Sequence, residues 1–168
     1  MSLPHTRIGH GYDLHRLEPN HSPGGGRPFV LGGVGLEHPM GPVSHSDGDA
    51  VYHAVVDAVF GALGLPDIGQ KFPDNDPTNE GADSARFVMA ARDSLKRGGY
   101  GILNLDVTVI CERPKLAPIK ARMIENIARL LEIDPLRVNL KGKTHEGVDA
   151  IGEGRAVEVH AVVLIERL

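Results

Sequence analysis

Residues 46–63 read Ser-Asp-Gly-Asp-Ala-Val-Tyr-His-Ala-Val-Val-Asp-Ala-Val-Phe-Gly-Ala-Leu, and this stretch says more about the fold than any other. Its apolar residues recur at the i, i+3, i+4 and i+7 spacing of a helix, and a second apolar stripe lies beside the first. Ser46 or Asp47 stands where an N-cap is needed. A helix that is apolar nearly all round is buried, so the spacing predicts a core helix over 46–63.

Three polar residues interrupt these stripes, and their spacing of four places them on one face of the helix. They are Asp49, His53 and Asp57, and the stretch contains no Lys or Arg that could pair with them. Buried acids and histidine are costly unless a metal ion or hydrogen bonds satisfy them. The sequence therefore predicts a metal ion or a hydrogen-bond network on this face.

The rest of the chain mixes strand and helix patterns without strict alternation, which favours one α+β domain over residues 1–168. We expect a mixed or antiparallel sheet with helices on one face. A long glycine-rich connection over 18–28, with no role that the sequence indicates, and a loop over 66–77 join these elements. Strands are predicted over 7–17, 29–36 (as the second strand of a long hairpin), 102–112, 138–143 and 155–166, and helices over 82–97 and 114–131.

Composition excludes several classes of protein. The chain has 168 residues and a net charge of −4 without any block of Lys or Arg, which argues against nucleic acid as the partner. No apolar run approaches the ~20 residues of a membrane helix, so no membrane partner is expected. Cys111 is the only cysteine, which excludes an intramolecular disulfide and fits a reducing compartment. We expect a cytoplasmic protein, or a plastid protein if a transit peptide has been removed.

A metal site is predicted from two separate segments. Asp13 and His15 are two apart on a predicted strand and so share a face, close enough to chelate one ion. Each segment alone also fits ordinary hydrogen-bonded side chains. With His53 they make three ligands, which leaves the fourth position of a tetrahedral zinc open for water or substrate. Manganese and iron remain open, and Asp49 or Asp57 is expected to hold the other ring nitrogen of His53.

Three further segments each allow a structural and a functional interpretation. Residues 45–49 either cap the helix or form a seat for phosphate at its start. Residues 67–77 are either a solvated turn or a loop whose carboxylates accept hydrogen bonds from hydroxyl groups. The basic residues of 113–115 and 141–146 are either an exposed edge or a set of cations for a diphosphate.

Taken together, these segments resemble the 2-C-methyl-D-erythritol 2,4-cyclodiphosphate synthases of the non-mevalonate isoprenoid pathway. The likeness spans nearly the whole chain, and five motifs in this order make it specific although each is weak alone. They are Gly9-His10-Gly11-Tyr12-Asp13-Leu14-His15, Ser44-His45-Ser46-Asp47-Gly48-Asp49, Asp67-Ile68-Gly69, Phe72-Pro73-Asp74-Asn75-Asp76-Pro77 and Arg113-Pro114-Lys115.

The resemblance implies a homotrimer around a central cavity, with three active sites between adjacent subunits. It also implies a CDP-polyol phosphate substrate, zinc at Asp13, His15 and His53, and Mg²⁺ or Mn²⁺ at Glu146. The expected catalytic residues are His45 and Thr144. The expected substrate-binding residues are Asp13, Leu14, His15, His45 and Ser46 near the 2-phosphate; Asp67, Ile68 and Gly69 at the ribose; Phe72, Pro73, Asp74, Asn75 and Asp76 over the methylerythritol; Cys111, Lys115 and Ala117 at the cytosine; and Lys143, Thr144, His145 and Glu146 at the diphosphate.

The implied reaction joins the 2-phosphate to the β-phosphorus and releases CMP, so catalysis consists of positioning and charge neutralisation. Two metal ions would supply the positive charge that an acidic protein lacks. The alternatives are a zinc phosphohydrolase, in which the open zinc position activates water, and a trimeric metal-binding scaffold without activity.

The sequence departs from the commonest family pattern after Lys141. Ala150 stands where many members have an aromatic residue, and Glu153 stands where they have an arginine. In the family these residues border the central cavity, where members can hold an isoprenyl diphosphate. We therefore predict weak or no binding of that ligand here, unless Arg155 replaces the missing arginine.

Overall fold

The computed structural model describes residues 4–20 and 25–168, and its centre is a five-stranded sheet. The strand order is β4-β1-β7-β5-β6, and every neighbouring pair is antiparallel except β5 and β6, which are parallel. The predicted mixed sheet is confirmed. The strands are β1 (Thr6–Pro19), β4 (Met40–Pro42), β5 (Tyr100–Ile110), β6 (Val138–Lys143) and β7 (Ala156–Arg167).

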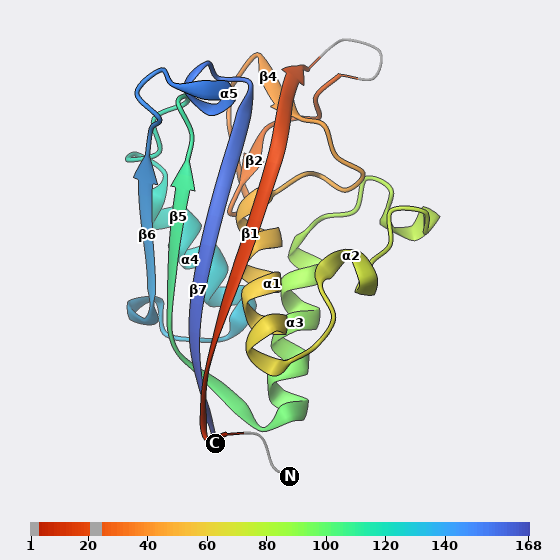
Figure 1. Ribbon diagram of the computed structural model, residues 1–168, viewed down its shortest axis with the longest axis vertical. Coiled ribbons are helices and arrows are strands. Elements are labelled where there is room, and N and C mark those ends of the chain that lie inside the picture. The colour runs from red at the N-terminus through yellow and green to blue at the C-terminus, as the bar shows by residue number, and fades with distance from the viewer. Residues whose placement is uncertain (1–3, 21–24) are drawn as a thin grey trace.

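Three helices cover one face of this sheet, as predicted: α1 (Ala50–Leu63), α3 (Ala85–Gly98) and α4 (Lys120–Leu131) (Figure 1). The other face carries no helix in the described part of the chain. Short elements lie in the connections between the long helices and strands. They are α2 (Ile68–Lys71), α5 (Asp149–Gly152) and the 3₁₀ turns η1 (Pro77–Asn79) and η2 (Pro135–Arg137). A separate small hairpin consists of β2 (Val30–Leu31) and β3 (Val34–Gly35).

The helix α1 packs unusually close to β1, and two glycines make this possible. A Cβ atom on Gly11 would lie 1.9 Å from the carbonyl oxygen of Ala54, and one on Gly9 would lie 1.9 Å from that of Ala58. Only residues without a side chain fit between the strand and the helix backbone. Because of this contact, β1 and α1 lie side by side where both carry polar residues.

The core helix is confirmed, but its start differs from the prediction. It begins at Ala50 after the N-cap Asp49, because Gly48 adopts a φ of +76° that a helix cannot continue through. Both apolar stripes are buried by the chain's own sheet and helices. Within a single chain, this helix therefore has almost no apolar surface left for a neighbouring subunit to cover.

The predicted strand over 29–36 is wrong, and so is its hairpin with the first strand. Gly32 and Gly33 have φ of +55° and +70° and turn the chain between β2 and β3. The carboxylate of Asp49 accepts from both of their amides, at 2.9 and 2.7 Å, which ties this turn to the start of α1. The hairpin partner of β1 is instead β4. The connection over 18–28 includes 21–24, which lie outside the described residues.

Other boundaries also differ from the prediction. The helix predicted over 114–131 begins only at Lys120, because Pro118 disfavours helical geometry at Ala117. The loop predicted over 66–77 contains the single turn α2, whose N-cap is Asp67, and it leads into η1. The helix predicted over 82–97 runs from Ala85 to Gly98, and Gly99, which has a φ of +69°, is its C-cap.

The face of the sheet opposite the helices carries apolar side chains in contact with solvent. The side chains at even-numbered positions of β1 and β7 point there, because successive residues of a strand alternate between faces. Ile8 is 69% exposed, and other large apolar residues on this face are Tyr12, Leu14 and Val162.

Candidate metal centre and substrate pockets

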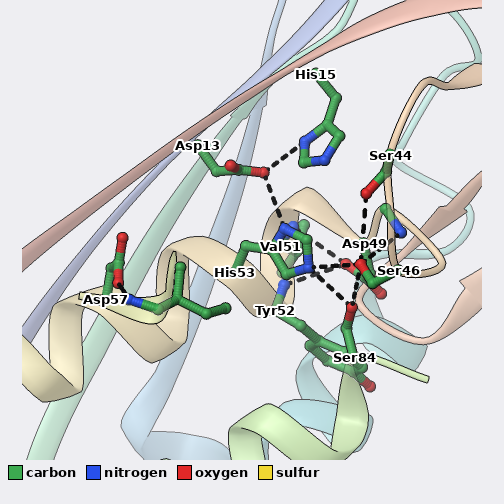
Figure 2. Close-up of polar contacts among 12 residues, drawn as sticks. Asp13, His15, Ser44, Ser46, Asp49, Val51, Tyr52, His53, Asp57 and Ser84 are labelled. Carbon is green, nitrogen blue, oxygen red and sulfur yellow. Dashed lines mark hydrogen bonds and ion pairs between the residues drawn. The ribbon is translucent and has the colours of Figure 1, made fainter. Parts of the chain in front are cut away.

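The close contact of β1 with α1 brings the three predicted metal ligands together. Asp13 and His15 project from the helix-facing side of β1, and His53 projects towards them from α1 (Figure 2). One ligand atom from each of the three lies within 4.8 Å of the other two. The Asp13 Oδ2 atom is 2.7 Å from His15 Nδ1 and 3.5 Å from His53 Nδ1. The structure thus confirms that these residues make a group able to hold a metal ion.

Two polar atoms in this group are buried without a hydrogen bond, namely Asp13 Oδ2 and His15 Nδ1. They are close, but their geometry is not that of a hydrogen bond, and atoms that converge in this way are typical of ligands aimed at one ion. Burial acts to raise the pKa of Asp13, yet His15 and His53 outweigh it and lower that pKa to about 2. Burial acts to lower the pKa of His53, yet Asp13 raises it.

The other ring nitrogen of His53 is held by serines, not by Asp49 or Asp57. His53 Nε2 lies 2.9 Å from Ser84 Oγ and 3.2 Å from Ser46 Oγ (Figure 2). The Ser84 hydroxyl in turn donates to the Asp47 carboxylate at 2.5 Å, and this hydrogen bond orients the hydroxyl. Such a partner fixes the ring orientation of a metal-binding histidine.

The two acids expected beside His53 have structural roles instead. Asp49 is fully buried, caps α1 through the amides of Val51 and Tyr52, and binds the hairpin turn described above. Asp57 is half-buried and accepts from the amide of Ile68 at 2.8 Å. Burial raises the pKa of Asp57, although this hydrogen bond opposes the shift. The prediction that Asp49 and Asp57 share one helix face is therefore not borne out, because Asp49 precedes the helix as its N-cap and the two acids contact different segments.

A pocket of about 350 Å³ opens above the metal ligands. It contains the predicted phosphate seat of His45 and Ser46, and also Ile68, Gly69, Phe72 and Asp74 from the predicted hydroxyl-binding loop. Leu14 lines it beside the two ligands from β1. Sequence reasoning missed Asn79, Ser84 and Phe87, because their neighbourhood reads only as a turn followed by a helix start.

Several predicted substrate-binding residues of the same loop do not line this pocket. Asp67 caps α2 through the amide of Gln70, and Asp76 caps η1 through the amide of Thr78. Pro73 and Asn75 do not line it either, and the Pro73 carbonyl accepts from the Asn79 side chain at 2.9 Å. The loop therefore presents some of its polar groups to the pocket and uses others to hold its own shape.

A second pocket of about 670 Å³ lies between the end of β5, the end of β6 and the segment before α4. It contains the other predicted binding residues, except His145. Burial raises the pKa of the Cys111 thiol to about 11, and its Sγ donates to the Arg113 carbonyl at 2.8 Å. The predicted residues that line this pocket are Cys111, Lys115, Ala117, Lys143, Thr144 and Glu146.

The segment after β6 is held by local hydrogen bonds. Thr144 donates to Glu146 at 2.6 Å, and His145 Nδ1 lies 2.9 Å from Asp149. Arg155 forms a pair with Glu153, with its Nε 2.7 Å from the carboxylate. Each therefore neutralises the other, and Glu153 stands at the position where the family pattern has an arginine.

The two pockets share no lining residue within one chain. The metal ligands and His45 lie at one of them, while Lys115, Thr144 and Glu146 lie at the other. A single described chain therefore does not bring all the predicted site residues together.

Comparison with known proteins agrees with the motifs. A family model described as the YgbB family matches residues 6–166. The chloroplastic 2-C-methyl-D-erythritol 2,4-cyclodiphosphate synthase of Oryza sativa is 51% identical over 161 residues, which cover 96% of this chain and 70% of that protein. The synthase of Dechloromonas aromatica is 46% identical over 162 residues, which cover 96% of this chain and 98% of that one.

Solved structures agree as well. A structure titled as the CDP complex of IspF from Plasmodium falciparum has a TM-score of 0.85 and 39% identity, and the match covers 99% of both chains. The bifunctional IspDF of Campylobacter jejuni has a TM-score of 0.89 and 35% identity, and the match covers 97% of this chain and 42% of that one.

Proposed function

This chain belongs to the YgbB family, and we infer from this membership and from its site that it is a cyclodiphosphate-forming enzyme. It converts 4-diphosphocytidyl-2-C-methyl-D-erythritol 2-phosphate to 2-C-methyl-D-erythritol 2,4-cyclodiphosphate and CMP. An oxygen of the 2-phosphate forms a new bond to the β-phosphorus. The bond from the β-phosphorus to the oxygen that it shares with the α-phosphate breaks, and that oxygen leaves with CMP.

The pocket above Asp13, His15 and His53, called the metal-site pocket below, is proposed to bind the 2-phosphate, which is the attacking group. His45 and Ser46 lie at its wall and would hold the 2-phosphate, because a histidine and a hydroxyl are good partners for phosphate oxygens. Asp67, Ile68 and Gly69 would bind the ribose, and residues 72–76 would cover the methylerythritol. These residues would keep the attacking oxygen in line with the β-phosphorus, and this positioning accounts for much of the rate.

The donor set of Asp13, His15 and His53 fits zinc. Imidazole and carboxylate ligands suit this ion, and three protein ligands leave a position open for substrate. A zinc ion bound there would supply positive charge to the phosphate oxygens. Glu146 would hold a second divalent ion, Mg²⁺ or Mn²⁺, at the diphosphate.

The second pocket is proposed to take the cytidine diphosphate part of the substrate. Cys111, Lys115 and Ala117 would surround the cytosine, and Lys143, Thr144, His145 and Glu146 would lie near the two phosphates. Thr144 is proposed as a catalytic residue together with His45. The Plasmodium falciparum structure to which the chain is similar is titled as a CDP complex, which supports a nucleotide in this role.

We propose a homotrimer in which each active site combines the metal-site pocket of one subunit with the second pocket, which binds the nucleotide, of its neighbour. Two observations support it. The two pockets share no lining residue within one chain, and the open face of the sheet carries the exposed apolar residues Ile8, Tyr12, Leu14 and Val162. Packing of these faces around a threefold axis would bury them and leave a central cavity.

The compartment is proposed from composition and relatives. None of the helices within residues 4–20 and 25–168 is long and apolar enough to cross a membrane. The Oryza sativa relative is named as chloroplastic, whereas the Dechloromonas aromatica relative belongs to a bacterium. A reducing compartment, either the cytoplasm or a plastid, fits the single buried thiol of Cys111.

The observation that carries the proposal is the convergence of Asp13, His15 and His53, with buried ligand atoms that lack hydrogen bonds. The test is incubation of the purified protein with the CDP-polyol phosphate and a divalent metal. The expected products are CMP and the cyclic diphosphate in equal amounts. Release of linear phosphate would indicate a phosphohydrolase, and metal uptake without CMP release would indicate a binding scaffold.

A further inference from the structure

The connection over 18–28 contains Arg27, and this residue reaches the predicted phosphate seat. Its guanidinium donates through Nε to the Ser44 carbonyl at 2.8 Å and through NH2 to the His45 carbonyl at 2.9 Å. Two successive carbonyl groups of one segment are thus held by the fork of a single arginine. The same guanidinium also contacts the carboxylate of Glu80.

Glu80 links this arginine to the side chain of His45. One of its carboxylate oxygens contacts Arg27, and the other lies 3.1 Å from His45 Nε2. One nitrogen of the His45 imidazole therefore faces a carboxylate oxygen of a residue that lies outside the pocket. Its Nδ1 makes no hydrogen bond with any residue that the structure describes, so this atom is the one left to meet a ligand.

Neither Arg27 nor Glu80 lines the metal-site pocket, whereas Ser44, His45 and Ser46 do. Arg27 and Glu80 lie outside the pocket and contact it only through residues 44 and 45. We propose that Arg27 and Glu80 are positioning residues that fix the main chain and the ring of His45 for the phosphate end of the substrate. This inference rests on the proposed function, and it assigns a role to Arg27 of the 18–28 connection.

The contacts of Arg27 and Glu80 with Ser44 and His45 are not what folds residues 44–47. The His45 carbonyl also accepts from the Gly81 amide at 2.8 Å, and the Asp47 amide donates to the Ala82 carbonyl at 3.0 Å. These main-chain bonds remain when a side chain is shortened. The Arg27 and Glu80 side chains are 31% and 55% exposed, and ion pairs with such exposure contribute little to stability. Variants at these positions should therefore fold.

The experiment compares Arg27→Met, Glu80→Ala and Glu80→Gln with the wild type. We expect kcat for CMP release to fall about tenfold in Arg27→Met and Glu80→Ala, because the attacking phosphate is held less well in line. CDP lacks that phosphate, so its dissociation constant should stay unchanged. Glu80→Gln keeps an acceptor for His45 and should retain more activity than Glu80→Ala.

Matched controls are Arg122→Met and Glu37→Ala, since both residues are exposed and make no ion pair with another described residue. Both controls should keep the wild-type kcat. Wild-type kcat and KM in Arg27→Met and Glu80→Ala would overturn the proposal. A parallel loss of CDP binding would also overturn it, because that would show a general structural role.

A measurement without turnover separates this proposal from the proposed function. The ¹⁵N signals of the His45 ring should move in Glu80→Ala and should not move in Glu37→Ala. A wild-type protein that releases no CMP would refute the proposed function, and the ring signals would still decide whether Glu80 holds His45. Unchanged ring signals in Glu80→Ala would overturn the proposal that Glu80 positions the ring of His45.

Discussion

Replacing Gly11 by alanine should break the contact on which the metal site depends. The new Cβ would lie 1.9 Å from the Ala54 carbonyl oxygen, whereas real contacts of this kind stay beyond 3.0 Å. The strand β1 and the helix α1 must therefore separate by about 1 Å or more. Asp13 and His15 lie on the strand and His53 lies on the helix, so the same shift pulls the ligands apart.

The expected effect is large on both stability and metal binding. Overpacking of this kind typically costs 1–3 kcal/mol, and contact with two rigid backbones puts Gly11→Ala at about 3 kcal/mol or more. That is a substantial share of the ~5–15 kcal/mol of a typical domain. Metal–ligand distances tolerate changes of only ~0.2 Å, so a shift of about 1 Å should weaken zinc binding by orders of magnitude.

Urea unfolding in the presence of a chelator measures the first effect, and competition with a chromogenic chelator measures the second. Gly35→Ala is the matched control, because a Cβ at Gly35 meets nothing within 4 Å. Its stability should stay within about 0.5 kcal/mol of the wild type. A Gly11→Ala protein with wild-type unfolding and wild-type zinc affinity would refute the argument that this glycine sets the strand–helix distance.

The remaining predictions concern the metal ligands, pH, assembly and the central cavity. His53→Ala should lose zinc and CMP release while remaining folded, and full zinc occupancy by metal analysis would contradict the assignment. When a chelator has removed the metal, the lowered pKa of Asp13 stabilises the fold above pH 3.8, and this contribution is lost as the pH falls towards about 2. The raised pKa of His53 stabilises the fold below pH 6.5, and this contribution is lost as the pH rises further. Urea unfolding should therefore show the largest cost of Asp13→Asn between pH 3.8 and 6.5, and a cost that does not vary with pH would speak against this. Sedimentation should show a trimer, and an active monomer of 18.0 kDa would rule out shared sites. Farnesyl diphosphate should not raise the thermal midpoint, because Glu153 already neutralises Arg155; a clear rise that Arg155→Ala abolishes would show the opposite.

Periodicity and residue type were sufficient for the parts of the structure that depend on local sequence. The alternating pattern of β1, the apolar stripes of α1 and the boundaries of β6 follow from the spacing of side chains along the chain. The metal ligands could also be predicted, because i, i+2 spacing on a strand aligns Asp13 and His15, and His53 interrupts an otherwise apolar helix. Residue chemistry and spacing thus determined the ligand set and the fold class.

Other features required knowledge of which segments meet. The break of 29–36 into a hairpin depends on the contact of Gly32 and Gly33 with Asp49, which is distant in sequence. The partners of the His53 ring could not be predicted, because a serine at a helix start gives the same signal whether it caps the helix or faces a histidine.

The close contact of β1 with α1 and the support of His45 were likewise decided only by tertiary packing. Gly9 and Gly11 read as part of a motif, but only the approach of α1 shows why no side chain fits there. Arg27 and Glu80 are 53 residues apart, and nothing in their local sequence connects them. The physical reason is that periodicity reports how a residue faces relative to its neighbours in one element, whereas a site is made by the distance between elements, which the packing of the whole core sets.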